Sequence, residues 1–344
     1  MIEPGRYTSG AIAIANLTAL ICGLEGRRAE GAGVEDLAAL SQCLFRRGDI
    51  LARIADHDRA ESIAAESIAL SPASARSSYI RAQLAARFHR FDEASDELDQ
   101  ALAKGHPRKE IDTERASLLQ AVGRYDEALF LRKRFVKSNP GIHSYGALAS
   151  LLAEMEQWTA ADVRYSAALN ADRSVSPLAC SQLLFEWGVS AMRRSDLDRA
   201  EMIFRKLDTI LPAHVPGRGH RAEVALARGD ADTAVALVAP LLECSDDPEY
   251  RATYAEILAR LGNGNAEREA ERAAVDYERL LARRPEAYAD HAAAFFMGVG
   301  NRPQRALELA LANRRIRDTP RSRKLVAKAV QNAQRSSAAQ MDLA

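Results

Sequence analysis

The amino-acid sequence predicts an all-α fold in which helical hairpins stack into a solenoid. Alanine, leucine, arginine and glutamate dominate the 344 residues and aromatic residues make up only 6% of them, a composition that favours helices over strands. A second observation is a short pattern that recurs about every 34 residues, which is the sign of a stacked repeat. A third is proline, which cannot continue a helix and recurs in step with this pattern.

Each copy of the pattern carries a marker alanine, as in the segment YDEAL. Seven copies are clear, at intervals of 34, 34, 33, 39, 34 and 72 residues, and the last interval spans one divergent unit. The marker alanines are Ala60, Ala94, Ala128, Ala161, Ala200, Ala234 and Ala306. A small residue precedes each marker by twelve positions, at Gly48, Ala82, Ala116, Ala149, Gly188, Ala222 and Ala294. Agreement at two positions argues against a chance match in an alanine-rich chain.

The spacing fits a unit made of a helix, a turn and a second helix. A small residue in the first helix lets the second helix approach closely, with the marker alanine on the facing surface. An aspartate two residues before the marker, such as Asp126, suits the first turn of the second helix, where backbone N–H groups lack partners. Pro72, Pro140 and Pro212, each twelve residues after a marker, then end that helix. One such unit cannot bury its own apolar face, so neighbouring units must stack.

On these positions the sequence resembles the tetratricopeptide repeat family over residues 41–320. The resemblance implies a right-handed superhelix whose first helices line a concave groove, but it implies no single activity. The aromatic or large residue that this family carries four positions after the marker is present as Leu98, Tyr165, Phe204 and Val238. Two units depart from the pattern at this position, with Ala64 in the first unit and Arg132 in the third.

The chain is expected to form one continuous solenoid with capped ends. Residues 1–40 are predicted to hold an N-terminal helix and a capping segment, residues 41–320 about eight hairpins, and residues 321–344 a capping helix with a frayed tail. The 39-residue interval predicts a longer loop around residues 170–182. In the divergent unit we expect helices over about 249–261 and 266–283, with Tyr254 where the small residue belongs.

Bulk composition narrows the classes of function. The 47 basic residues are balanced by 47 acidic ones, which gives no general reason to expect binding to nucleic acid or to a membrane surface. The most apolar segment, residues 11–24, is shorter than the roughly 20 residues that span a bilayer. Four cysteines lie far apart without a C-x-x-C pair, so reduced thiols are expected. These features predict a cytoplasmic protein of bacterial type with no membrane insertion.

Motifs for catalysis and for cofactors are missing. The sequence has no P-loop, no H-E-x-x-H, no G-x-S-x-G and no glycine fingerprint after a strand. Its seven histidines are scattered, and no two lie four residues apart on one helix face, so no metal site is expected. Neither an enzyme nor a bound cofactor is therefore predicted.

Two segments have an unusual composition, and each allows a binding interpretation and a structural one. Residues 211–223, with the sequence LPAHVPGRGHRAE, could bind an anion or a partner, or could simply connect two hairpins after a proline stop. Residues 313–324 carry six basic side chains against one acidic one. They could contact nucleic acid or an acidic partner, or could form the polar outer face that a terminal cap needs. In both segments the second, structural interpretation is favoured.

The inward face of the first helices provides the candidate binding residues. The ten predicted groove residues are Arg53, Arg76, Tyr79, Gln83, Arg87, Glu110, His143, Glu154, Phe185 and Arg193. Three arginines of the first two units are expected near the aromatic ring of Tyr79, an arrangement that suits a carboxylate, a phosphate or an acidic peptide. Alternatively, Asp49 and its neighbours pair with these arginines and nothing binds to them.

The predicted function is a non-enzymatic interaction scaffold or adaptor that holds a peptide or protein segment in its groove. A first alternative is a sensor or an enzyme that uses the groove as a small-molecule pocket. A second is an accessory factor for the assembly or export of another protein. The partner and the oligomeric state stay open. A scaffold predicts an open groove of mixed charge, whereas a pocket predicts an enclosed cavity with convergent arginine, histidine and carboxylate groups. A meeting of His143, Glu154 and Arg87 within hydrogen-bond reach would weaken the scaffold interpretation.

Overall fold

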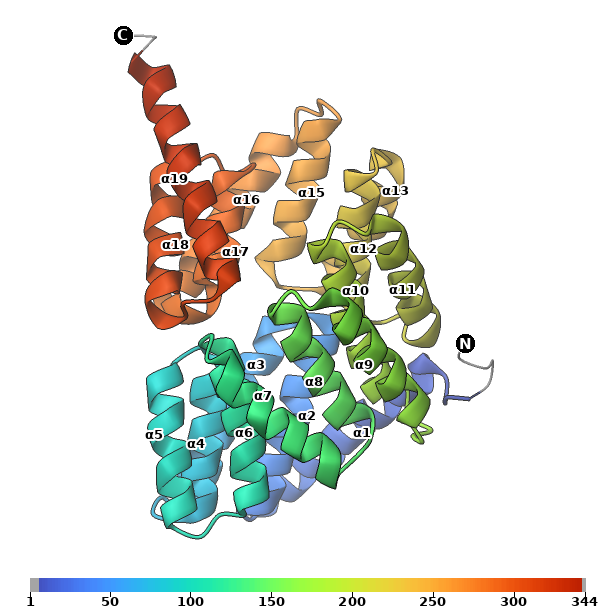
Figure 1. Cartoon of the computed structure of the whole chain (residues 1–344), viewed down its shortest axis with the longest axis vertical. Coiled ribbons are helices and arrows are strands. Elements are labelled where there is room, and N and C mark those ends of the chain that lie inside the picture. The colour runs from blue at the N-terminus through green and yellow to red at the C-terminus, as the bar shows by residue number, and fades with distance from the viewer. Residues whose placement is uncertain (1–5, 342–344) are drawn as a thin grey trace.

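The computed structural model describes residues 6–341 of the chain, with side chains as far as residue 336. Within this part every regular element is a helix, and the all-α solenoid is confirmed (Figure 1). One helix, α1 (Gly10–Ala29), precedes eight hairpins, and α19 (Pro320–Met341) follows them. The hairpins are α2 (Val34–Leu51) with α3 (Ile54–Leu70), α4 (Ala75–Arg87) with α5 (Phe91–Ala103), α6 (Arg108–Ala121) with α7 (Tyr125–Ser138), α8 (Ile142–Glu154) with α9 (Trp158–Ala171), α10 (Leu178–Arg193) with α11 (Leu197–Ile210), α12 (Val215–Ala227) with α13 (Ala231–Val238) and its continuation α14 (Leu241–Cys244), α15 (Pro248–Arg260) with α16 (Ala266–Arg283), and α17 (Pro285–Met297) with α18 (Pro303–Ile316).

The marker alanines lie where the two helices of each hairpin touch. All seven are fully buried, with 0% of their surface exposed. Six of the predicted small residues on the first helices are buried too: Gly48, Ala82, Ala116, Ala149, Gly188 and Ala222. Gly188 shows why size matters there, because a Cβ built on it would lie 2.4 Å from the ring of Phe204. The repeat period therefore follows from close packing between helices.

The last two hairpins correct the predicted small positions. Ala294 is exposed, and Ala292 takes its place with 0% exposure, because the turn between α17 and α18 spans residues 298–302 and shifts the count by two. In the divergent unit the small residue is Ala255, also 0% exposed, and Tyr254 beside it is only half-buried. On α16 the alanines Ala273 and Ala274 are buried, at 0% and 1% exposure. Both hairpins join their helices through a longer turn, over residues 261–265 and 298–302.

The ends of the helices explain the role of proline. Pro72, Pro140 and Pro212 each follow the last residue of a second helix, α3, α7 or α11, by two positions. At the N-terminal side, α2 begins at Val34, so the first hairpin starts before the predicted boundary at residue 41. At the C-terminal side, Thr319 and Ser322 exchange hydrogen bonds between side-chain hydroxyl oxygens and backbone N–H groups, which starts α19. The end of the predicted frayed tail, residues 342–344, lies outside the described residues.

The solenoid turns back on itself, so that its last repeats contact its first ones (Figure 1). The carboxylate of Asp246, just before α15, accepts hydrogen bonds from the backbone N–H groups of Ile54 and Ala55 at 2.6 and 2.9 Å. These groups are donors at the N-terminus of α3, so Asp246 caps a helix that is distant in the sequence. The guanidinium of Arg284 also lies 4.0 Å from the ring centroid of Phe88. This closure converts the concave groove into a central cavity.

The longer loop predicted around residues 170–182 is present as residues 172–177, between α9 and α10. Asp172 in this loop is buried, and its carboxylate accepts a hydrogen bond from the Tyr7 hydroxyl at 2.9 Å. The backbone N–H of Thr8 donates to the carbonyl oxygen of Val175 at 2.8 Å. The extra residues therefore hold the segment that leads into α1.

Candidate functional site

A cavity of about 1960 Å³ occupies the centre of the superhelix. The first helix of each of the eight hairpins contributes to its wall, and the N-terminal half of α19 contributes to its C-terminal side. Small-molecule sites occupy about 300–1,000 Å³. This cavity is therefore too large for one such ligand to fill.

Six of the ten predicted groove residues line the cavity: Gln83, Arg87, His143, Glu154, Phe185 and Arg193. The remaining four, Arg53, Arg76, Tyr79 and Glu110, do not form part of its wall. The first helices of all eight hairpins thus face the cavity, and the four residues that do not line it lie in the first three hairpins.

The four predicted residues that do not line the cavity contact neighbouring parts of the chain instead. Tyr79 is buried and stacks on His106 with 4.0 Å between ring centroids, and the guanidinium of Arg76 lies 5.8 Å from the Tyr79 ring centroid. Glu110 pairs with the same His106, at 3.0 Å between the carboxylate and Nε2. Arg53 lies in the turn after α2 and reaches the carbonyl oxygen of Cys244 at 3.5 Å, at the closure of the superhelix. The predicted cluster of three arginines around Tyr79 is therefore wrong.

Arg87 has a partner on the neighbouring hairpin. Its guanidinium binds both carboxylate oxygens of Asp49, and its Nη2 lies 2.8 Å from Nε2 of His57. Burial acts to raise the pKa of Asp49, but the hydrogen bonds from His57 and Arg87 hold it below its usual range. This pairing is the alternative in which Asp49 neutralises a groove arginine.

A second ion pair lies on the wall formed by α8 and α10. Arg193 donates to Glu154 at 2.6 Å, and its guanidinium lies 5.5 Å from the ring centroid of Trp158. Because Glu154 binds Arg193 and Arg87 binds Asp49, the predicted grouping of His143, Glu154 and Arg87 does not form. An arginine, a histidine and a carboxylate meet instead at Arg87, His57 and Asp49.

Arg132 and Glu186 are among the cavity residues that were not predicted as groove residues. Arg132 projects from α7, a second helix, and is only 7% exposed. It donates one hydrogen bond, from Nη2 to the Ser117 hydroxyl at 2.9 Å. Glu186 on α10 accepts a hydrogen bond from the side-chain amide of Gln182 at 3.0 Å, and burial raises the pKa of the Glu186 carboxyl. The sequence signalled Arg132 only as a departure from the apolar pattern of its repeat.

The C-terminal side of the cavity carries a network of charged side chains. Asp290 on α17 binds the guanidinium of Arg317, and the adjacent His291 lies 3.4 Å from the carboxylate of Glu249 on α15. The pKa of His291 is raised to about 10, first by Asp290 and then by Glu249, against the effects of burial and of Arg321. His291 is therefore protonated at neutral pH.

We expect the stability of the fold to fall as the pH rises into the alkaline range, because His291 then loses its proton. The pKa of His291 in the folded protein lies above the ordinary value near 6.5. Its contribution to the free energy of unfolding is therefore fully present below pH 6.5 and is lost as the pH rises through about 10. The side chain is 43% exposed, so added salt should weaken the effect. Thermal melts between pH 7 and pH 10 should show a steeper fall in Tm for the wild type than for His291→Gln.

A nuclear magnetic resonance titration provides the control for this prediction. His214 is the N-cap of α12, and burial lowers its pKa to about 4, so it should stay neutral where His291 stays charged. The His291 ring resonance should then remain at its protonated position between pH 6 and pH 8.5. A His291 resonance that titrates near pH 6.5 would contradict the prediction.

Both unusual segments are largely helical, and each contributes residues to the cavity wall. Residues 211–223 form little loop, because α12 begins at Val215. Gly217 and Gly219 are helical and face neighbours so closely that a Cβ on either would lie 2.5 Å from Leu207 or Tyr250. Of the basic segment 313–324, Arg317, Arg321 and Lys324 line the cavity and others pair at the surface with Asp318. Neither segment forms an isolated patch of positive charge.

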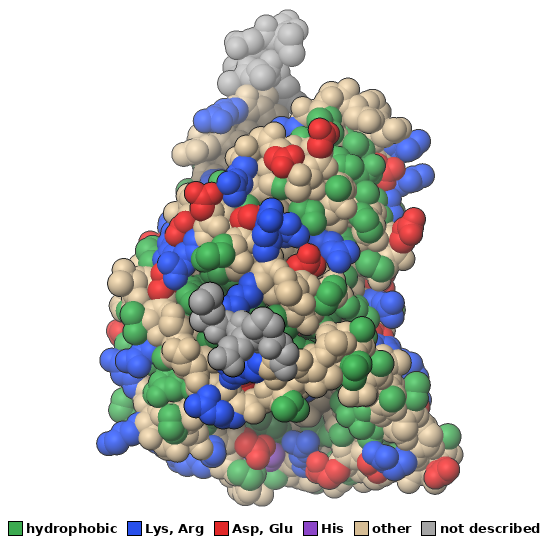
Figure 2. Space-filling model, turned by 90° about the vertical axis from the view of Figure 1, so that its right-hand side faces the viewer, with side chains coloured by type: hydrophobic (Ala, Val, Ile, Leu, Met, Phe, Trp, Pro, Cys, Tyr) green, Lys and Arg blue, Asp and Glu red, His purple; other side chains and the backbone are tan. Residues whose placement is uncertain are grey.

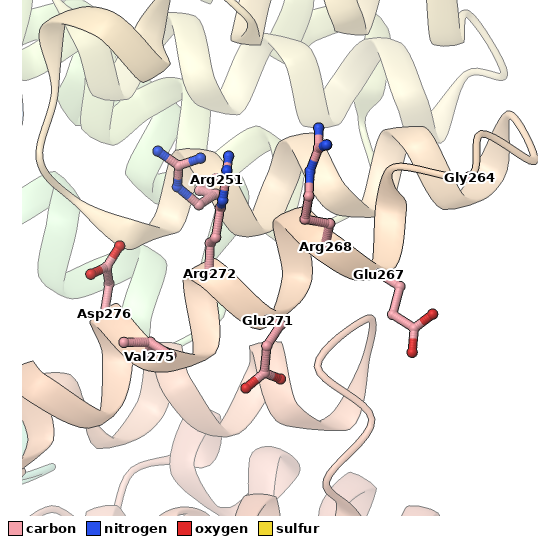
Figure 3. Close-up of a pocket in the computed structure, with 8 residues that line it drawn as sticks. All are labelled: Arg251, Gly264, Glu267, Arg268, Glu271, Arg272, Val275 and Asp276. Atoms are coloured by element: carbon pink, nitrogen blue, oxygen red, sulfur yellow. The ribbon is translucent and has the colours of Figure 1, made fainter.

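A smaller pocket of about 700 Å³ lies outside the central cavity, between α15 and α16. Figure 3 shows Arg251, Arg268 and Arg272 extending toward the same side of α16, while Glu271 points away from them. The three arginines share one buried carboxylate, Glu269, at 2.6, 3.5 and 3.1 Å. The shared carboxylate links α15 to α16, because Arg251 lies on α15 and Glu269 on α16.

The outer surface has no single-sign field on the face in Figure 2, where Lys and Arg side chains alternate with Asp and Glu. None of the helices between residues 6 and 341 combines the length and the apolar character that crossing a bilayer requires. In the same residues, no three His, Cys, Asp or Glu side chains gather so that they could hold a metal ion. The central cavity is therefore the candidate functional site.

Comparison with known proteins identifies the fold. No family model and no curated protein sequence matches the chain. Among solved structures, a Rap protein complexed with Competence and Sporulation Factor aligns at TM-score 0.58 and 15% identity, over 92% of this chain and 98% of its own. A tetratricopeptide repeat protein from Parabacteroides merdae aligns at TM-score 0.45 and 20% identity, over 72% and 92%. The type IV pilus biogenesis factor PilW aligns at TM-score 0.45 and 18% identity, over 60% and 94%.

Proposed function

We propose that this chain, whose fold is that of the tetratricopeptide repeat proteins, is a protein-interaction module that binds a short peptide segment in its central cavity. Its role is binding and not catalysis. The four cysteines are free thiols, which suits a reducing compartment, and we place this function in the cytoplasm.

The size and the wall of the cavity support this function. A volume of about 1960 Å³ is roughly twice the upper limit for small-molecule pockets, and it is surrounded by all eight hairpins. Its lining mixes ion pairs with aromatic and aliphatic side chains, such as Phe45, Leu183 and Phe185. A peptide offers backbone amides, charges and apolar groups together, so it can satisfy such a wall along its length. The Rap structure, which shares this fold, is itself complexed with a second molecule.

A bulky side chain on the cavity wall should weaken peptide binding without unfolding the chain. Ala147 lies on α8 at the cavity wall and is half-buried, so Ala147→Trp places an indole in the space that a peptide would occupy. We expect the wild type to retain members of a random hexapeptide library in affinity selection with detection by mass spectrometry. Ala147→Trp should retain them at least about tenfold less well, a change of about 1.4 kcal/mol in binding.

The matched control uses the outer helix of the same hairpin. Val163 on α9 is 60% exposed, and Val163→Trp adds the same side chain outside the cavity. This variant should bind the library as the wild type does. If the wild type retains no peptide, or if both variants lose binding equally, the cavity is not a peptide site.

A further inference from the structure

We propose that Arg132 is the binding group for one carboxylate of the ligand in the central cavity. This inference rests on the proposed peptide-binding function and adds the chemistry of one part of the peptide. Three observations carry it: the place of Arg132 in the repeat, its incomplete hydrogen bonding, and the lack of a competing partner.

Arg132 takes a position that is apolar in most of the other repeats. The equivalent residues Leu98, Tyr165, Phe204 and Val238 are all at most 1% exposed. Ala128 and Arg132 are the two buried residues of α7, so the arginine occupies the main core contact of that helix. An aliphatic side chain would fill the same space without the cost of removing a charge from water.

The guanidinium of Arg132 is buried and only partly satisfied. It is 7% exposed, and its Nε is a buried donor without a hydrogen-bond partner. Its one hydrogen bond goes to the Ser117 hydroxyl oxygen at 2.9 Å, and that hydroxyl donates in turn to the carbonyl oxygen of Thr113 at 3.3 Å. The guanidinium is thus held from one side by an oriented hydroxyl, which leaves other donors, including the Nε–H, for a planar acceptor.

Arg132 forms no ion pair with any residue of the described chain. The two carboxylates in its electrostatic surroundings are Glu114 and Glu186. Glu114 accepts hydrogen bonds from Tyr79 and Gln83 at 3.4 and 3.2 Å, and Glu186 accepts its hydrogen bond from Gln182. A buried cation without its counter-ion is unfavourable, and a ligand anion would relieve that cost.

One positive charge matches one carboxylate better than a phosphate dianion. Among the other arginines of the wall, Arg87, Arg193 and Arg317 are already paired with Asp49, Glu154 and Asp290. The group that Arg132 itself offers is one planar guanidinium, the shape that binds a carboxylate through two parallel hydrogen bonds. The carboxylate can belong to the C-terminus of a peptide or to an aspartate or glutamate side chain.

The test uses three synthetic hexapeptide pools with the full-length protein. The first pool has a free C-terminal carboxylate and no Asp or Glu, the second has a C-terminal amide and no Asp or Glu, and the third has a C-terminal amide with Asp and Glu included. Each pool is offered to the wild type, to Arg132→Met and to Arg134→Met. Arg134 lies on the same helix and is 59% exposed, so its replacement is the matched control.

We expect the wild type and Arg134→Met to retain a carboxylate-bearing pool about tenfold to a hundredfold better than the pool without carboxylates, the range of a charged hydrogen bond. Retention of the first pool identifies a C-terminal carboxylate, and retention of the third identifies a side chain. Arg132→Met should lose the preference and should melt at or above the wild-type temperature, since it removes a buried unpaired charge. Arg132→Lys, which keeps the positive charge but not the planar guanidinium, should retain part of the preference for carboxylate-bearing peptides.

The outcomes separate this inference from the function on which it rests. If the wild type retains all three pools equally and Arg132→Met does the same, the carboxylate site is wrong and the peptide-binding function stands. If the wild type retains no pool, the peptide-binding function fails and the carboxylate site fails with it. A preference for carboxylates that persists in Arg132→Met and Arg132→Lys also overturns the assignment.

Discussion

Replacing Phe204 with alanine is expected to destabilise the fold by about 3–5 kcal/mol, the range for a large aromatic side chain removed from a core. The ring is 1% exposed and packs directly against Gly188 on the facing helix of the same hairpin. Urea unfolding followed by circular dichroism measures the change as a shift in midpoint at constant slope.

The Gly188 side of the same contact should respond in a way that depends on Phe204. A methyl group at Gly188 would lie 2.4 Å from the ring, so Gly188→Ala alone should destabilise the protein by about 1–3 kcal/mol. In the Phe204→Ala variant the added methyl group occupies the space that the ring has left. Gly188→Ala then only gains the higher helix propensity of alanine, about 1 kcal/mol better than that of glycine. The second substitution should then be neutral or stabilising, with a coupling energy of about 1–3 kcal/mol.

Two substitutions elsewhere serve as controls for this cycle. Gly23 on α1 has no atom within 4 Å of a built Cβ, so Gly23→Ala should stabilise the protein by about 1 kcal/mol at most. Met202 is 62% exposed on the same helix as Phe204, and Met202→Ala should change stability by less than about 0.5 kcal/mol. Additive effects of Gly188→Ala and Phe204→Ala would show that the two side chains do not share one packing space.

The Gly188–Phe204 contact also shows what the sequence could predict about the fold. The twelve-residue spacing between small residue and marker paired Gly188 with Ala200, and the large residue four positions later is Phe204. Such counting works where the turn between helices has a constant length. It failed at Ala294 and Tyr254, because the turns after α17 and α15 are longer and the packing positions move with them.

The candidate site was less predictable, because it depends on which elements meet after the superhelix closes. Counting along first helices found Gln83 and Arg87 on the wall. It could not find that Arg53 faces Cys244, which is 191 residues further along the chain. Arg132 was visible only as a polar residue at an apolar position, since its long side chain reaches the cavity from a second helix. The side of a helix on which a residue lies follows from local periodicity. Whether that residue lines the cavity depends on how distant helices pack together.

Removing Asp290 is the second substitution with a large expected effect. Asp290 is 7% exposed and binds Arg317, whose side chain is 17% exposed and also donates to Asn313 at 2.9 Å. Asp290→Ala leaves this largely buried guanidinium without its anion, so we expect a loss of about 3–5 kcal/mol in the free energy of unfolding. Asp276 forms a surface pair with Arg279, and Asp276→Ala should change stability by less than about 0.5 kcal/mol.

The dependence of this loss on pH identifies its cause. Burial acts to raise the pKa of Asp290, but His291 and Arg317 hold it well below its usual range. The contribution of the carboxylate is therefore present above about pH 4 and is lost as the pH falls through the lower, folded value. The difference in stability between the wild type and Asp290→Asn, which keeps the shape, should accordingly narrow from pH 5 toward pH 2. A difference that stays constant over this range would mean that packing, and not the ion pair with Arg317, holds α17 against the segment before α19.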